Sequence, residues 1–176
     1  MRKTYGLRVW VLGAALLTAT AASADSTAAK SGGAGGHLKD RVGTWEATVE
    51  MPGAPPSKGT MVYKLEMNGQ WLVGQFTGNF GGMPFSGTGL DTYDPTQKKY
   101  VSVWVDSMSH SPLVMHGDYD EATHTVTMTG KGPDQTGKMV DMKTTLKIDG
   151  KDSLIFTLSN QGMPNDAMTI RYKRKN

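Results

Sequence analysis

The chain has 176 residues, with 19 Lys or Arg, 16 Asp or Glu and no Cys. The absence of cysteine excludes disulfide staples and a lipid-modified cysteine anchor, so packing alone must hold the fold. The nearly balanced charge gives no electrostatic basis for binding nucleic acid or an anionic membrane surface.

The first 24 residues are typical of a secretory signal peptide. A basic start precedes an apolar run at residues 9–22, which is short for a bilayer span, and a small-x-small cleavage site ends at Ala24. We expect cleavage after Ala24, a periplasmic or secreted mature protein and no stable membrane insertion after removal; a retained membrane anchor is the alternative. Removal takes three basic residues and leaves 16 of each sign.

Residues 25–37 are mostly Ser, Ala and Gly, which predicts a flexible linker. We expect one short helical turn at residues 37–42. From residue 38 to 176, apolar and polar residues alternate with period two, and turn residues interrupt the alternation about every ten residues. This pattern predicts an all-β domain, a single antiparallel up-and-down barrel of about ten strands. The strands are expected at residues 43–51, 58–68, 70–80, 84–93, 99–108, 112–119, 124–131, 139–148, 153–160 and 166–174.

The turn at Asn68-Gly69 fixes the register of its hairpin. Both residue types tolerate positive φ, so a two-residue type I′ turn is favoured. The resulting register places apolar residues of both strands on one face. The expected pairs are Leu65 with Leu72, Tyr63 with Gly74 and Met61 with Phe76.

The hairpin at residues 81–109 pairs a glycine-rich strand with an aromatic and β-branched strand. If Tyr93 faces Tyr100 across the turn, Gly89 faces Trp104 and Gly87 faces Asp106. A bare glycine backbone lets the indole lie over it. The inward face stays open at this point, because the Val101, Val103 and Val105 face is as apolar as the face that carries Trp104.

The Asp149-Gly150 turn differs from Asn68-Gly69. A two-residue turn there would place Leu154 and Phe156 beside polar residues. A three-residue loop of Ile148, Asp149 and Gly150, with Gly150 at positive φ, restores the apolar match. We therefore expect Leu146, Leu154 and Phe156 to share one face.

Gly43-Thr44-Trp45 at the start of the first strand, followed by a strand meander and a late Arg, resembles the calycin superfamily of lipocalin-like barrels. The resemblance implies that Trp45 plugs the closed end and that an Arg of the last strand lies across it, Arg171 first and Arg174 second. The chain also resembles the bacterial family named domain of unknown function 1579, which looks calycin-like and has no established activity. The matching segments include Trp71-Leu72-Val73-Gly74, Tyr93-Asp94-Pro95, Lys98-Lys99-Tyr100-Val101, Asp106-Ser107-Met108-Ser109 and Gly132-Pro133-Asp134.

Small barrels either fill their interior or hold one small ligand. We prefer the second interpretation: binding of a small apolar or amphipathic molecule inside the barrel, without catalysis and without a cofactor. The expected lining is Tyr63, Phe76, Trp104, Met115 and Phe156, with Asp106 or His116 as polar contacts. The competing hypothesis is an interaction module with a filled core, which docks through Met83-Pro84 and Met163-Pro164.

Three chemical alternatives remain open. Asp106, Ser107, Ser109 and His110 contain the residue types of a hydrolytic triad, but groups this close on one strand point in different directions. His116 and His124 are candidates for a metal or haem ligand. Met-His pairs and a Met pair are candidates for soft copper(I) ligands outside the cytoplasm; these are Met108 with His110, Met115 with His116, and Met139 with Met142. A weak enzyme that uses a cavity carboxylate and a histidine is a related possibility.

Overall fold

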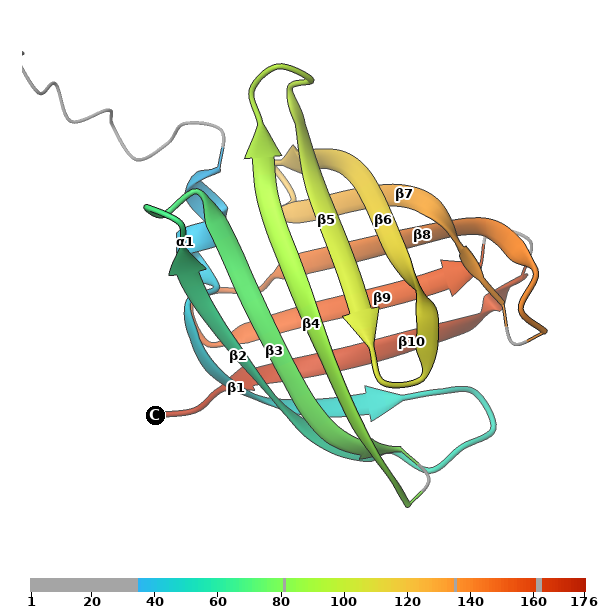
Figure 1. Cartoon of the computed structure of the whole chain (residues 1–176). Helices are drawn as coiled ribbons and strands as arrows, with labels where there is room; N and C mark the ends of the chain where they lie inside the picture. The colour runs from blue at the N-terminus through green and yellow to red at the C-terminus, as the bar shows by residue number, and fades with distance from the viewer. Residues whose placement is uncertain (1–34, 81, 135, 161–162) are drawn as a thin grey trace, which may run out of the picture.

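The computed structural model describes residues 35–80, 82–134, 136–160 and 163–176, without the side chains of residues 163–166. The expected signal peptide and most of the expected linker lie outside the described residues. Ten antiparallel strands form a closed barrel in which each strand pairs with its neighbours in the chain and β1 pairs with β10 (Figure 1). The predicted all-β up-and-down barrel is confirmed. Within the described residues, no helix is long and apolar enough to cross a membrane.

The elements agree closely with the expected ranges, since most strand ends differ by no more than three residues. They are α1 (Gly36–Asp40), β1 (Gly43–Glu50), β2 (Ser57–Glu66), β3 (Trp71–Phe80), β4 (Met83–Asp94), β5 (Lys99–Asp106), β6 (Ser109–Asp120), β7 (Thr125–Pro133), β8 (Met139–Ile148), β9 (Ser153–Asn160) and β10 (Met163–Arg174). The helix begins slightly earlier than expected, and His37 is buried within it. The end of the expected linker is therefore packed against the barrel.

The β2–β3 register is the predicted one, and its turn is slightly longer. Met61 pairs with Phe76, and Leu65 pairs with Leu72. Asn68 and Gly69 have φ values of 59° and 77°, as a type I′ turn requires, and Met67 also has positive φ. The buried face of this hairpin follows from the turn residues.

The β8–β9 connection contradicts the expected three-residue loop. Leu146 pairs with Phe156, and Ile148 pairs with Leu154. The longer connection is closed by a hydrogen bond from the Asp149 amide to the Ser153 carbonyl. Gly150 has positive φ, and Leu146, Leu154 and Phe156 share a face as expected, because the two registers differ by an even number of residues.

The β4–β5 hairpin has the expected register, with Gly89 opposite Trp104 and Gly87 opposite Asp106. The face that carries Trp104 points inward, since Val105 on the opposite face is 48% exposed. A Cβ atom at Gly87 would overlap the indole, whereas a Cβ at Gly89 would lie 3.3 Å from it. The two glycines therefore provide the space in which the Trp104 ring lies across the sheet.

Replacing Gly87 by Ala should force the Trp104 indole out of its position and lower the free energy of unfolding by about 1–3 kcal/mol, the usual cost of overpacking. Gly89→Ala is the matched control, because its methyl group needs only a small adjustment of the same ring. Urea unfolding followed by tryptophan fluorescence measures both variants. Equal stability of the two variants would show that the ring is not confined over Gly87.

Candidate functional site

The two ends of the barrel differ in chemistry. We call the end that carries α1 and the loops at residues 67–70, 95–98, 121–124 and 149–152 the α1 end. The opposite end, with the loops at residues 51–56 and 107–108, is the mouth (Figure 1). Trp45, Leu72, Leu154 and Tyr172 are buried inside the α1 end, with half-buried Leu65, Tyr93, Tyr119 and Ile148 at its rim, and a larger set of interior side chains is half-buried at the mouth.

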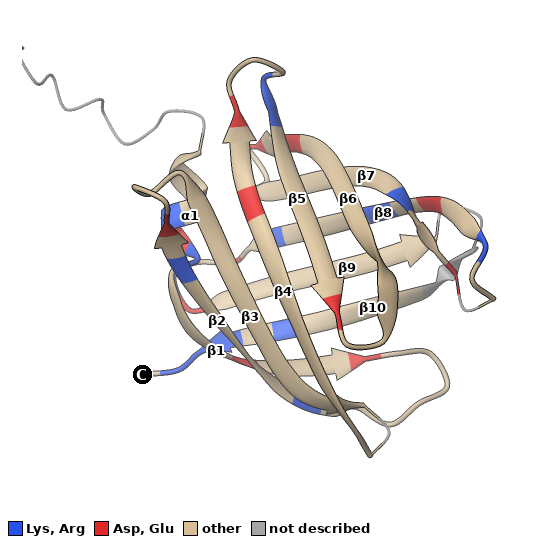
Figure 2. Cartoon of the chain, in the orientation of Figure 1, with Lys and Arg blue, Asp and Glu red and all other residues tan. Residues whose placement is uncertain are grey.

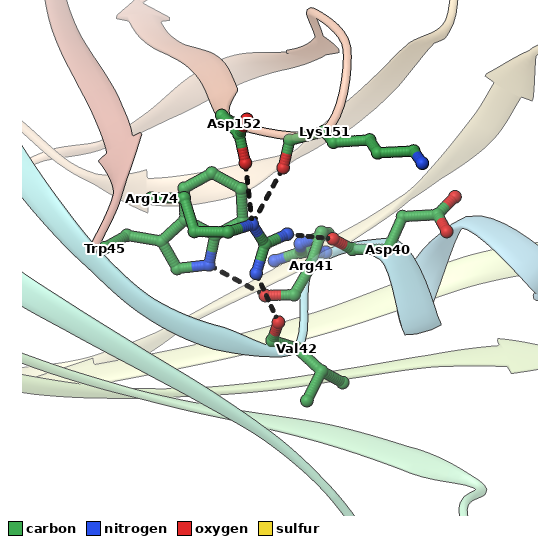
Figure 3. A network of polar contacts seen from close by, with 7 residues as sticks. All are labelled: Asp40, Arg41, Val42, Trp45, Lys151, Asp152 and Arg174. Atoms are coloured by element: carbon green, nitrogen blue, oxygen red, sulfur yellow. Dashed lines mark hydrogen bonds and ion pairs between the residues drawn. The ribbon is translucent and has the colours of Figure 1, made fainter. Parts of the chain in front are cut away.

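Trp45 plugs the α1 end with no exposed surface. The guanidinium carbon of Arg174 lies 4.0 Å from the indole centroid, and the indole Nε1 donates to the Arg41 carbonyl at 2.8 Å. Arg174 also donates to the carbonyls of Asp40, Val42 and Lys151 at 2.7–2.8 Å (Figure 3). The plug therefore joins α1, β1, the β8–β9 loop and β10.

The expectation that Arg171 covers Trp45 is wrong, and the second choice, Arg174, does so. Arg171 is exposed and forms an ion pair with Glu50 at 3.3 Å on the outer surface. Side chains alternate along a strand, so Arg174 shares the inward face with the buried residues Ile170 and Tyr172, while Arg171 faces outward.

A buried ion pair lies beneath the plug. The Arg41 Nη2 atom is 2.6 Å from Oδ2 of Asp91, and both residues are under 8% exposed. The Arg41 guanidinium also lies 4.5 Å from the centre of the Tyr63 ring. Burial lowers the pKa of Arg41, but its interactions with Tyr63 and with the Asp91 carboxylate outweigh burial and raise its pKa overall. The arginine therefore stays charged inside the barrel.

The sequence contained a signal for this pair that we did not use. β3 has no charged residue, and β4 has only Asp91 and Asp94 (Figure 2). Asp91 lies on the same face of β4 as Gly87 and Gly89, so alternation predicts that its side chain points inward. A lone carboxylate on an inward face requires a cation nearby.

His37 lies beside the ion pair, between two tyrosine rings. Its ring is stacked on Tyr119 at 4.3 Å and tilted against Tyr100 at 4.4 Å. Neither ring nitrogen has a hydrogen-bond partner among the described residues. Burial, and then the positive charge of Arg41, lower the pKa of His37 to about 4, although Asp91 opposes the shift. The imidazole is therefore neutral at neutral pH.

Asp106 holds Trp104 at the mouth. The indole Nε1 donates to Asp106 Oδ2 at 2.9 Å, and Asp106 Oδ1 accepts the backbone amides of Met108 and Ser109, also at 2.9 Å. The carboxylate caps the β5–β6 turn and fixes the indole over the two glycines. The hydroxyl of Ser107 accepts the amide of Ser86. The hydrogen bonds of Asp106 and Ser107 thus go to the turn, the indole and β4.

The mouth is lined by half-buried apolar side chains that face the interior. By contrast, Trp45, Leu72 and Leu154, nearer the α1 end, are at most 1% exposed. The half-buried set at the mouth is Met51, Phe80, Phe85, Trp104, Leu113, Met142 and Met168. Phe80 and Phe85 are in ring contact at 4.4 Å, and each also contacts Phe76.

The predicted ligand contacts are spread along the barrel. Trp104, Asp106 and Phe76 lie toward the mouth, and Phe156 is half-buried deeper inside. Tyr63 is at the α1 end under Arg41, and Met115 is fully buried.

The prediction that His116 faces the interior is wrong, because its side chain is exposed on the outer surface of β6. Adjacent strand residues point to opposite faces, so His116 and the buried Met115 cannot both line the interior. For the same reason, Met115 and His116 lie on opposite faces of β6 and do not form the copper(I) ligand pair that the sequence suggested. The Nδ1 atom of His124 forms a hydrogen bond with the Tyr119 hydroxyl at 3.0 Å, and the tautomer of the ring determines which group donates. Within the described residues, no three His, Cys, Asp or Glu side chains are grouped to hold a metal ion.

A hollow of about 350 Å³ lies on β3, β4 and β5 near the mouth. Phe76 and Asp106 border it, but most of its side chains belong to the outer face, among them Gln75, Thr77 and Ser86. This hollow therefore opens on the outside of the sheet, and it does not correspond to the predicted interior site.

Residues 34–174 match the family described as "Protein of unknown function (DUF1579)". The search of curated proteins found no match. Among solved structures, Rv2717c from M. tuberculosis is similar with a TM-score of 0.57 and 16% identity, over 79% of this chain and 95% of that chain. A fluorescence-activating β-barrel designed de novo has a TM-score of 0.46 and 14% identity, over 79% of this chain and 97% of that chain. The identities are so low that the likeness to Rv2717c concerns the fold alone.

Arg174→Met should lower the free energy of unfolding by about 2–4 kcal/mol, because it removes the stacking on Trp45 and three hydrogen bonds to carbonyls. Arg171→Met is the matched control, and its loss should stay within about 1 kcal/mol, as for other exposed ion pairs. Urea unfolding of both variants tests the assignment, which fails if Arg171→Met costs as much as Arg174→Met.

His37 should make the fold less stable in acid. Its pKa rises from about 4 in the folded chain to about 6.5 on unfolding, so between these values the unfolded chain binds more protons. Stability should therefore fall as pH drops from neutral to about 4, with His37 contributing roughly 3 kcal/mol. In His37→Phe the fall should be smaller by that amount. His110→Phe, a substitution at an exposed histidine of β6, is the matched control, and a pH profile of His37→Phe equal to that of the unmodified protein would refute the prediction.

Proposed function

This chain belongs to the DUF1579 family, whose function is unknown, and we propose that it binds a small apolar or amphipathic molecule at the mouth of its barrel. The observation that supports the proposal is the contrast in burial along the interior. At the α1 end Trp45, Leu72 and Leu154 are at most 1% exposed and the half-buried apolar side chains, such as Leu65 and Tyr93, lie at the rim, whereas the larger half-buried set at the mouth faces the interior. We also propose, from the N-terminal sequence, that binding takes place in the periplasm or outside the cell.

Inward apolar surface in contact with water is a favourable place for an apolar molecule. Covering about 100 Å² of such surface contributes roughly 2.5 kcal/mol. The mouth also combines flat rings with flexible methionine side chains, including Met142 and Met168, which adapt to irregular shapes.

Trp104 is the central residue of the proposed site. Its indole lies over Gly87 and Gly89, its nitrogen is already bonded to Asp106, and its remaining surface is half-exposed. The ring therefore offers a fixed apolar surface without an unsatisfied polar group. Asp106 supports this surface through the indole and the turn, so its expected role changes from ligand contact to positioning of Trp104.

Titration with the uncharged dye Nile red tests the proposal. Trp104→Ala should weaken dye binding by about tenfold, since roughly 1.4 kcal/mol of contact is lost. Trp71→Ala is the matched control, because Trp71 is also half-buried but lies on the opposite face from the fully buried Leu72. Circular dichroism confirms that each variant is folded.

Two results would contradict the proposal. One is a lack of Nile red binding by the unmodified protein, which would favour the interaction module with a filled core. Its Met83-Pro84 segment is exposed at the start of β4, whereas the side chains of Met163-Pro164 lie outside the described residues. The other is equal loss of binding in Trp104→Ala and Trp71→Ala, which would place the dye elsewhere.

A further inference from the structure

A second hollow, of about 670 Å³, lies at the α1 end, opposite the mouth. It is bordered by α1 and the residue just before β1, by the β6–β7 and β8–β9 loops with the adjoining ends of β6 and β8, and by the last residue of β10. Its lining residues are Lys39, Asp40, Val42, Tyr119, His124, Ile148, Gly150, Lys151, Asp152 and Arg174. None of the half-buried mouth residues takes part in it.

Arg174 fixes the walls of this hollow. Its guanidinium binds the carbonyls of Asp40, Val42 and Lys151, and it lies 3.4 Å from the Asp152 carboxylate (Figure 3). These partners belong to two different walls of the hollow. Because the walls are held together without a ligand, binding there needs little ordering of loops.

The side chains that line the hollow carry an excess of one positive charge, since Lys39, Lys151 and Arg174 face Asp40 and Asp152. The ammonium groups of Lys39 and Lys151 have no hydrogen-bond or ion-pair partner among the described residues. In Figure 3 the Lys151 side chain points away from Arg174 and ends on the side of the Asp40 carboxylate, with no interaction drawn between them. The Asp152 carboxylate is paired with Arg174, and three nearby carbonyls are occupied by the same arginine. The Asp40 carboxylate also lines the hollow and has no hydrogen-bond or ion-pair partner among the described residues, so the two ammonium groups exceed it by one positive charge, which favours an anion.

The hollow also has an apolar side. Val42 is 37% exposed although it is apolar, and Ile148 and the Tyr119 ring are half-buried beside it. The Tyr119 ring is supported by its stacking on His37. An apolar group placed here would cover surface that water now contacts.

His124 is held in a strained conformation at the edge of the hollow. Its φ of 52° is uncommon for a residue with a side chain. The strain is maintained by a hydrogen bond from the Ile148 amide to its carbonyl at 2.9 Å and by the contact of its ring with the Tyr119 hydroxyl. Lys98 has nearly the same φ, 53°, at the end of the β4–β5 turn, so this conformation belongs to the hairpin turn, and its effect here is to fix the imidazole beside Tyr119.

We propose that this hollow binds a small molecule that joins one anionic group, a carboxylate or a phosphate, to an apolar body. Lys39 and Lys151 contact the anion, and Val42, Ile148 and Tyr119 contact the apolar part. The site is separate from the mouth and does not depend on the function proposed for it.

The fluorescent probe 1-anilinonaphthalene-8-sulfonate, an aromatic body with one anionic group, tests this site in the folded protein. The double variant Lys39→Glu/Lys151→Glu should bind the probe about tenfold more weakly, because both attractive charges become repulsive. Raising the salt concentration should also weaken probe binding by the unmodified protein, because salt screens the attraction between the ammonium groups and the anion.

The matched control is Lys64→Glu/Lys143→Glu, which makes the same change in net charge at exposed outer positions of β2 and β8. Its probe affinity should stay within about twofold of the unmodified protein, since charges beyond a Debye length are screened. Lys39→Met/Lys151→Met should give an intermediate loss, and circular dichroism confirms folding.

The proposal is overturned if Lys39→Glu/Lys151→Glu binds the probe normally, if the control loses as much, or if Trp104→Ala alone abolishes binding. Nile red binding at the mouth is measured in parallel, so the two proposals can fail independently.

Discussion

The contact of Arg174 with Trp45 is the interaction on which the α1 end depends. A closed barrel has no sheet edge, so its ends are the places where water can reach the interior. Here the indole fills the end, and the guanidinium both covers the indole and binds the carbonyls of the chain segments around it. Those segments in turn cover His37 and the Arg41–Asp91 pair, and they form the walls of the large outer hollow.

The buried ion pair divides the interior into two parts. Breaking such a pair by removing one partner costs about 3–5 kcal/mol, because the other charge is left buried alone. Arg41, Asp91 and Tyr63 thus form a fixed polar layer between the plug and the apolar middle of the barrel. The side of this layer that faces the mouth is lined by apolar side chains, which supports the proposal of an apolar ligand near Trp104.

The predictions that succeeded rest on alternation, which determines the face of each residue but not the full register. Strand ranges and the β2–β3 and β4–β5 pairings followed from turn residues together with alternation. The β8–β9 loop was mispredicted because any shift by an even number of residues leaves Leu146 and Phe156 on the same face. The actual loop length depends on the Asp149–Ser153 hydrogen bond, which no pattern in the chain reveals.

The candidate site was predicted less well than the fold. Alternation by itself shows that His116 cannot line the interior together with its neighbour Met115. It also shows that Arg174, and not Arg171, shares the inward face of Tyr172 and can cover Trp45. The Arg41–Asp91 pair and the position of His37 join residues that are 50 or more positions apart in the chain, so they emerge only when the barrel closes. The hollow at the α1 end likewise combines four separate segments, each of which is ordinary by itself.

The pairing of β1 with β10 has a consequence for how the chain reaches this structure. Trp45 and Arg174 are partners across that pairing, although almost the whole domain lies between them. All other strand pairs join neighbours in the sequence, so they form early as local hairpins. Closure must wait for the last strand, and until then β1 presents an unpaired edge to other chains. The residues of β10 therefore decide whether a nearly complete sheet closes on itself or adds strands from other chains.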